Sequence, residues 1–206
     1  MKKKQYESIV TPKGIAIYPF LIQPDTKYNA LGDYKVSLSV NEDESAPLIG
    51  KIDAEIEKLK LEAPKNKKLK LNEPPYTAEL DDEGQETGRI IFKFKRKAKV
   101  TLADGKTLEF SPKLFDAEGT LAEGVESIWG GSELCVSADL IPYSMPTGSG
   151  VSLRLKAVQI IKLVEGSGGR AGQFGFEATD GYVAPKVEEV QEEVVAYADE
   201  EEDFSA

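Results

Sequence analysis

The thirteen residues GRIIFKFKRKAKV, at positions 88–100, constrain the fold more than any other stretch of the chain. In an extended strand, successive side chains point to opposite faces. The odd positions from Arg89 to Lys99 are basic except for Ile91, whereas the even positions are mostly apolar. This alternation predicts a β-strand with one cationic face and one face turned towards a hydrophobic core.

The net charge of the chain contrasts with this cationic face. The 206 residues include 26 basic and 36 acidic side chains, which gives a net charge of −10. The acidic excess is concentrated at one end, because residues 166–206 hold eleven acidic side chains and two basic ones. Residues 1–165 are therefore close to neutral, and this part of the chain can carry a basic groove.

The remaining patterns predict further strands and one helix. Strands are expected at 14–22 (where Pro19 indicates an edge or a bulge), 34–40, 106–110, 113–119 (with a turn), 133–143 and 151–165. Apolar residues at helical spacing over 48–59 predict a helix, with Ser45 as its cap and Pro47 in its first turn. Residues 1–12 are expected to form a frayed basic arm, and 144–150 a loop.

These elements favour one mainly β domain over residues 1–165. The expected architecture is a five-stranded barrel of the oligonucleotide-binding (OB) type, with extra strands and one α-helix. Residues 166–186 are predicted to be a glycine-rich linker. Residues 187–206 are predicted to be a disordered acidic tail, because they have too little apolar surface to fold alone.

Composition excludes several classes of chemistry. The chain has no histidine and one cysteine, which removes histidine-based catalysis, Cys/His metal sites and an internal disulfide. It has no GxxxxGK[ST] phosphate loop, no run of eighteen apolar residues and no apolar segment after its basic start. We therefore expect a protein without cofactor, metal or membrane span, in a reducing compartment, with Cys135 buried. A carboxylate–metal nuclease is the enzymatic alternative left open.

Three features together favour binding to single-stranded nucleic acid. Residues 89–99 carry six basic side chains and no acidic one, which suits a phosphate backbone. Aromatic residues accompany the basic strands, and flat rings stack on exposed bases with about 1–3 kcal/mol per base. The acidic tail holds Phe204 near its end, which is typical of a docking peptide. The predicted DNA-binding residues are Arg89, Lys93, Lys95, Lys97, Lys99, Trp129, Tyr143, Arg154 and Lys156.

Each of these features also has a purely structural interpretation. A lysine-rich strand face is often no more than a solvated face. Phe92, Phe94 and Tyr34 share the apolar parity of their strands, so the core is favoured for them over base stacking. Trp129 lies beside two glycines, where its ring can cover the domain or face a ligand. Tyr143 lies at a strand end beside a predicted loop, which favours exposure.

The ordered set of motifs resembles the single-stranded DNA-binding proteins of short-tailed phages (podophages). The resemblance covers most of residues 14–206 and is carried by IAIYPFLIQPD, DYKVSLSV, IIFKFKRKAKV, GGSELCVSADLIPY, GVSLRLKAVQIIKLVE, DGYV and the acidic end with its aromatic residue. It implies an OB-fold and non-enzymatic, sequence-tolerant binding of single-stranded DNA in replication, recombination and repair. It adds Lys35 to the expected DNA contacts and supports Lys93, Lys95 and Tyr143.

The resemblance also implies partners. It implies a homodimer in the cytoplasm of the infected bacterial host, with a tail that contacts the phage DNA polymerase and primase-helicase. The docking residues would be Glu200, Glu201, Glu202, Asp203 and Phe204. The chain departs from the family because Ser205 and Ala206 follow the aromatic residue and because Val and Ala dilute the acidic residues between 187 and 198. The alternative function is an acidic-tailed β-domain that binds proteins but not DNA.

Overall fold

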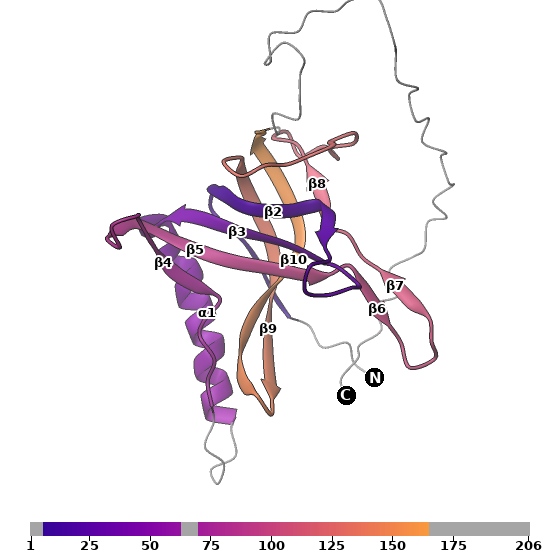
Figure 1. The fold of residues 1–206 in the computed structure, drawn as a ribbon. Helices are drawn as coiled ribbons and strands as arrows, with labels where there is room; N and C mark the ends of the chain where they lie inside the picture. Colours follow the sequence, from indigo (N-terminus) through magenta and orange to yellow (C-terminus); the bar gives the residue numbers. More distant parts are fainter. Residues whose placement is uncertain (1–5, 63–69, 165–206) are drawn as a thin grey trace, which may run out of the picture. The chain divides into compact units, whose positions relative to one another are not determined.

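A closed ring of five strands forms the centre of the domain (Figure 1). The computed structural model describes residues 6–62 and 70–164. The ring consists of β2 (Gly14–Asp25), β3 (Asp33–Asn41), β5 (Glu86–Lys97), β9 (Glu133–Met145) and β10 (Gly148–Lys162). The order is β9-β2-β3-β5-β10, and β10 pairs with β9 to close the ring. The mainly β fold with five-stranded closure and one helix is confirmed for the described part of the chain.

Five shorter strands accompany the ring; three of them pair with ring strands and two form a separate sheet. They are β1 (Glu7–Val10) beside β9, β4 (Tyr76–Leu80) beside β5, β8 (Lys113–Phe115) beside β10, and the separate pair β6 (Lys99–Thr101) and β7 (Thr107–Glu109). Figure 1 shows the hairpin of β6 and β7 projecting away from the ring. The predicted linker 166–186 and tail 187–206 lie outside the described residues, so the domain boundaries stay predictions.

Two segments expected to be irregular are regular strands. Residues 7–10, expected in a frayed arm, pair in register with β9, and Ser8 lies opposite Asp139. Most of the loop expected at 144–150 belongs to the β9–β10 hairpin, whose strands end at Met145 and resume at Gly148. Residues 7–10 are ordered by a partner strand distant in sequence, whereas residues 143–150 pair with each other across the tight turn of the hairpin, and in both cases strand pairing satisfies the backbone.

The apolar side chains of the strands fill the ring, as their alternation predicts. Phe92 and Phe94 are 0% and 1% exposed, which confirms the core interpretation for both. Tyr34 is half-buried and packs against the same core. The segment 151–165 is a strand as predicted, because Leu153 and Leu155 are buried and alternate with outward-facing side chains.

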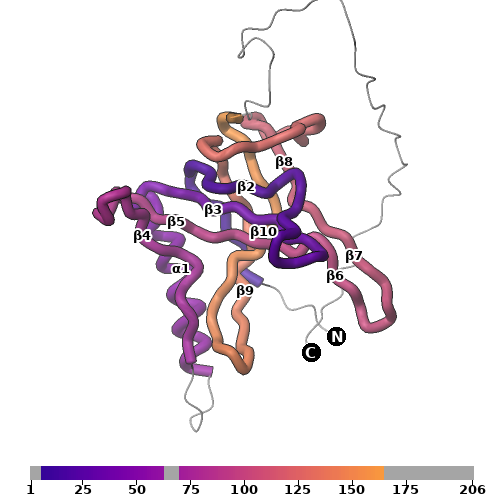
Figure 2. Tube along the Cα trace, in the orientation of Figure 1, coloured from indigo at the N-terminus to yellow at the C-terminus, as the bar shows by residue number. Residues whose placement is uncertain are grey.

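The helix α1 (Glu42–Glu62) lies beside the ring (Figure 2) and packs against four of its strands. Its Leu48 and Ile52 side chains are buried. It begins before the predicted cap. The amide of Asp43 donates a hydrogen bond of 3.1 Å to Asn41 Oδ1, so Asn41 caps the helix. Ser45 is buried inside the helix and donates to the carbonyl of Asn41 instead. No helix in the described ranges is long and apolar enough to cross a membrane.

Two glycines test the packing of the ring. A Cβ on Gly14 would lie 2.7 Å from the Ser39 carbonyl oxygen and 2.7 Å from Leu38 Cγ, whereas a Cβ on Gly50 in α1 would meet nothing within 4 Å. We expect Gly14→Ala to lower the free energy of unfolding by about 1–3 kcal/mol through overpacking. Gly50→Ala should raise the free energy of unfolding by about 0.5–1 kcal/mol, because alanine loses less backbone conformational freedom on folding than glycine does. Urea unfolding measures both, and equal stability of the two variants would contradict the packing described here.

Candidate nucleic-acid interface

Six basic side chains from three ring strands share one outer surface, here called the cationic face. They are Lys35 on β3, Lys93, Lys95 and Lys97 on β5, and Arg154 and Lys156 on β10. The register explains their grouping, because Lys35 lies opposite Lys95 and Lys95 lies beside Arg154. The structure therefore brings together six of the ten predicted DNA-binding residues.

Three carboxylates share this surface, and the sequence patterns missed them. Asp33 Oδ2 lies 3.0 Å from Lys95 Nζ, and Asp25 pairs with Lys35. Asp139 lies 3.1 Å from Arg154 Nη2 and 3.2 Å from Lys156 Nζ. The carboxylate side chains are only 9–13% exposed. Lys93 and Lys97 have no ion-pair partner within the described residues, so the six cations differ in how strongly they are neutralised.

Two of these carboxyl groups have altered acidities. Burial alone would raise the pKa of Asp139, but hydrogen bonds from Ser8 (2.5 Å), Arg154 and Lys156 outweigh it and lower the pKa. The hydrogen bond from Lys35 lowers the pKa of Asp25, and the amide of Lys27 adds to the effect. Both groups therefore stay ionised at neutral pH and oppose the neighbouring cations with full charges.

Exposed aromatic rings border the cationic face on β2 and its following loop. Phe20 lies opposite Lys35, whose ammonium is 5.0 Å from the ring centroid. Tyr18 is 81% exposed and has a φ of +47°, an uncommon conformation for an aromatic residue. The strand register shifts between Ile17 and Phe20, which confirms the bulge that Pro19 indicated. Tyr28 projects from the loop between β2 and β3.

These three rings were not among the predicted contacts. The pattern of IAIYPFLIQPD predicts a strand, and the turn residues after it predict a loop. The available signal was the unusual density of aromatic residues around Pro19: a bulge reverses the parity of a strand and so exposes rings that alternation would bury. The position of these rings relative to β3 depends on the β2–β3 register, which the sequence does not reveal.

Two predicted basic contacts lie elsewhere. The bend at Ala98 ends β5, and Lys99 belongs to β6, where it pairs with Glu109. The expectation that Lys99 shares one strand face with Arg89 is therefore wrong. Arg89 remains on β5, but its side chain is half-buried and donates to the side chain and carbonyl of Ser39 at 2.6 and 2.7 Å. Its guanidinium also pairs with Glu79.

The two predicted aromatic contacts are placed differently from each other. Tyr143 is half-buried rather than freely exposed. Its hydroxyl accepts a hydrogen bond of 3.1 Å from Asn72, and its ring lies so close to Gly150 that a Cβ there would be 2.9 Å from the hydroxyl oxygen. Trp129 is exposed, in the loop before β9, and its amide donates to the carbonyl of Val164. The adjoining Gly131 bonds to Ala16, so this loop borders the first part of β2.

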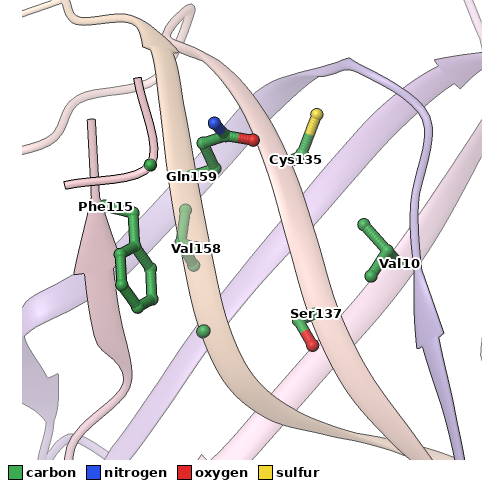
Figure 3. Close-up of a pocket in the computed structure, with 8 residues that line it drawn as sticks. Val10, Phe115, Cys135, Ser137, Val158 and Gln159 are labelled. Carbon is green, nitrogen blue, oxygen red and sulfur yellow. The ribbon is translucent and has the colours of Figure 1, made fainter. Parts of the chain in front are cut away.

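An open pocket of about 340 Å³ on the outer surface of β9 and β10 is a separate feature (Figure 3). Its lining includes Val10, Phe115, Cys135 and Ser137 and contains no charged side chain. Cys135 is half-buried here, which corrects the expectation of full burial, and desolvation raises the pKa of its thiol. The lining of this pocket thus has no positive charge to neutralise a phosphate. No cluster of side chains suited to a metal ion occurs within residues 6–62 and 70–164.

The position of the cationic face corresponds to the usual ligand surface of OB-folds. In that fold, ligands lie on the second and third strands and against the loops that join strands 1–2 and 4–5. Counted around the ring in chain order, these are β3, β5, the loop holding Tyr28, and the β9–β10 hairpin beside Tyr143. Basic and aromatic groups thus gather where this architecture binds extended chains.

Comparison with known proteins gives consistent matches. The family model described as "Single-stranded DNA-binding protein, Bacteriophage T7" matches residues 13–163. The chain is 30% identical over 156 residues to the single-stranded DNA-binding protein of Enterobacteria phage T3, covering 73% of this chain and 66% of that one. It is 32% identical over 146 residues to that of Escherichia phage T7, covering 63% and 62%. The matched region thus spans slightly less than two thirds of either relative.

Solved structures agree with these matches. The crystal structure of gp2.5, a single-stranded DNA-binding protein encoded by bacteriophage T7, superposes with a TM-score of 0.61 at 25% identity, covering 88% of this chain and all of that one. The single-stranded DNA-binding protein of bacteriophage Enc34, solved in complex with single-stranded DNA, shares the fold with a TM-score of 0.58 at 18% identity, covering 78% and 89%. The family model spans most of the described domain, and the chain therefore belongs to the single-stranded DNA-binding protein family of bacteriophage T7.

Proposed function

We propose that the protein binds single-stranded DNA, without sequence preference, along the cationic face. The observation that carries this proposal is the cross-strand row formed by Phe20, Lys35, Lys95 and Arg154 on four neighbouring strands. This row places an aromatic ring and three cations on a path that runs across the sheet. Phosphates bind the cations, and bases stack on rings, which accept any base because every base has a π-face.

The rings near the path suggest how far the bound strand extends. Phe20, Tyr18 and Tyr28 lie at the β2 side of the face, and Tyr143 lies four residues beyond Asp139 along β9. Four residues of strand span about 13 Å, so a DNA strand of several nucleotides can contact both groups. The hydrogen bond between Tyr143 and Asn72 orients this ring in the free protein.

The biological role belongs to the same proposal. We assign the protein to phage DNA replication, recombination and repair in the cytoplasm of an infected bacterium, acting as a homodimer. Its tail, residues 187–206, has nine acidic side chains and no basic one. This segment recruits the phage DNA polymerase and primase-helicase, with Glu200 to Asp203 supplying charge and Phe204 an apolar anchor. The family membership and the charge of the tail support this assignment.

Salt dependence tests DNA binding at the cationic face. Lys93 and Lys97, which have no ion-pair partner among the described residues, should each neutralise a phosphate. Each such contact contributes about 0.7 to the slope of log K against log salt for single strands. Lys93→Gln with Lys97→Gln should therefore flatten the slope by about 1.4. Anisotropy of labelled oligo-dT at several salt concentrations gives the slopes.

The matched control for this experiment removes two positive charges from α1, by Lys58→Gln with Lys60→Gln. These lysines pair within the helix with Glu55 and Glu57, so their loss should leave the slope nearly unchanged. Equal effects of the two double variants would place the DNA elsewhere. If the full chain and a chain lacking the tail both fail to bind oligo-dT, the protein-binding alternative replaces this proposal.

Phe20 provides a test of base stacking. Phe20→Ala should weaken binding to oligo-dT by about 1–3 kcal/mol, because one stacked base loses its platform. Leu121→Ala removes another exposed apolar side chain, from outside the ring strands, and should have no effect on affinity. Affinity is measured at high salt, where phosphate contacts contribute least. Unchanged affinity of the Phe20 variant would remove this ring from the path.

The acidic tail provides a test of recruitment. A tethered polyanion is present near the cationic face at an effective concentration in the millimolar range, so it should compete with DNA. Deletion of 187–206 should raise oligo-dT affinity, most at low salt, where the attraction is least screened. Phe204→Ala should leave DNA affinity unchanged but weaken binding to the polymerase or helicase in pull-down experiments. Equal DNA affinities of the truncated and full chains at low salt would refute the competition.

A further inference from the structure

The paired and unpaired cations of the cationic face are expected to respond differently to DNA. We propose that Asp25, Asp33 and Asp139 act as built-in counterions, which limit the affinity of the cationic face for DNA and its dependence on salt. This inference rests on the proposed function, because it concerns the same surface. It assigns roles to three acidic residues and divides the basic residues into two groups.

The two side chains of each ion pair differ in their exposure to solvent. Lys95 is 64% exposed at its side chain, whereas its partner Asp33 is 9% exposed. The side chain of Arg154 is likewise more exposed than that of its partner Asp139, at 40% and 9%. The carboxylates thus lie beneath the cations, which still present unused N–H donors to solvent. An ammonium has three donors and a guanidinium has five, so a phosphate can bind from above without displacing the carboxylate.

The ion pairs of Asp33 and Asp139 with their cations are costly to separate. Asp33 Oδ1 is buried and has no hydrogen-bond partner within the described residues, so the ion pair between Oδ2 and Lys95 is the contact that offsets the charge of this carboxylate there. Removing Lys95 would leave a buried, unpaired charge, which is strongly unfavourable. Asp139 likewise holds two cations and accepts from Ser8, which ties β1 to the same cluster. Binding of DNA should therefore leave the pairs intact.

The number of counterions that DNA releases on binding determines how strongly the affinity depends on salt. Binding of a full positive charge to a phosphate releases a condensed counterion, which is the source of the salt dependence. A lysine that remains paired with a carboxylate has already been neutralised. Its contact with a phosphate supplies hydrogen bonds and position but little counterion release. The salt dependence of binding should then come mainly from Lys93 and Lys97, which have no such partner in the described parts of the chain. The one positive charge that Asp139 leaves unneutralised on Arg154 and Lys156 should add to it.

The test replaces Asp33 by asparagine. The amide keeps an oxygen that can accept from Lys95, but it removes the negative charge and makes Lys95 a full cation. The slope of log K against log salt for oligo-dT should steepen by about 0.7. The gain in affinity over the unaltered protein should therefore grow about fivefold for each tenfold decrease in salt. Adding Lys95→Gln to the Asp33→Asn variant, where no buried charge is left unpaired, should flatten the slope again by about 0.7 and return it close to that of the unaltered protein.

Glu57→Gln is the matched control, because it removes one negative charge from an ion pair on α1; its slope should not change. Asp25→Asn, which releases Lys35, is the second variant and is used alone if Asp33→Asn does not fold, as judged by its circular dichroism spectrum. An unchanged slope, or weaker binding with an unchanged slope, would overturn the inference while leaving DNA binding intact. Failure of the unaltered protein to bind oligo-dT would overturn the proposed function and this inference together.

Discussion

The burial of Phe92 and Phe94 is the constraint on which the other features depend. Both side chains are at most 1% exposed in the ring interior, and a strand shifted by one residue would turn its apolar set to solvent. Lys93, Lys95 and Lys97 are therefore forced outward. Pairing then carries this parity across the sheet, because β3 lies antiparallel to β5, with Lys35 opposite Lys95, and β10 lies parallel to it, with Arg154 beside Lys95. Core packing thus positions the cationic face.

Local patterns were sufficient to predict elements whose burial alternates along a single strand. The β5 alternation, the strand at 151–165 and the aromatic core residues of β5 all follow from a period of two. Membership of the cationic face could be predicted for Lys93, Lys95 and Lys97 for the same reason. Ser45 was misassigned as the helix cap because Asn41, which ends β3, already satisfies the first turn. Such a choice between neighbouring polar residues depends on where the preceding strand ends.

Features that depend on pairing between distant strands could not be predicted. Asp25 and Asp33 lie at the two ends of a segment with turn chemistry, and nothing local indicates that they face Lys35 and Lys95. Asp139 has the outward parity of β9, but its contact with Arg154 requires the β9–β10 register. Lys99 was assigned to the wrong surface because a bend at Ala98 interrupts an alternation that continues unbroken in the sequence. Cys135 was expected to be buried because β9 has a strand pattern, yet it faces outward into an open pocket.

The three carboxylates give the body of the protein a charge distribution that composition alone conceals. Residues 1–165 are nearly neutral, yet on the cationic face the opposite charges are arranged in layers, with three carboxylates beneath the cations. A surface of this kind attracts phosphate at short range, where hydrogen-bond donors matter, and much less at long range, where paired charges cancel. A surface that attracts phosphate mainly at short range favours a DNA strand that lies closely along the sheet. On the proposed path, the nearby rings of Phe20 and Tyr28 are within reach of the bases, so the buried acids and the exposed aromatic residues support the same extended arrangement of the DNA.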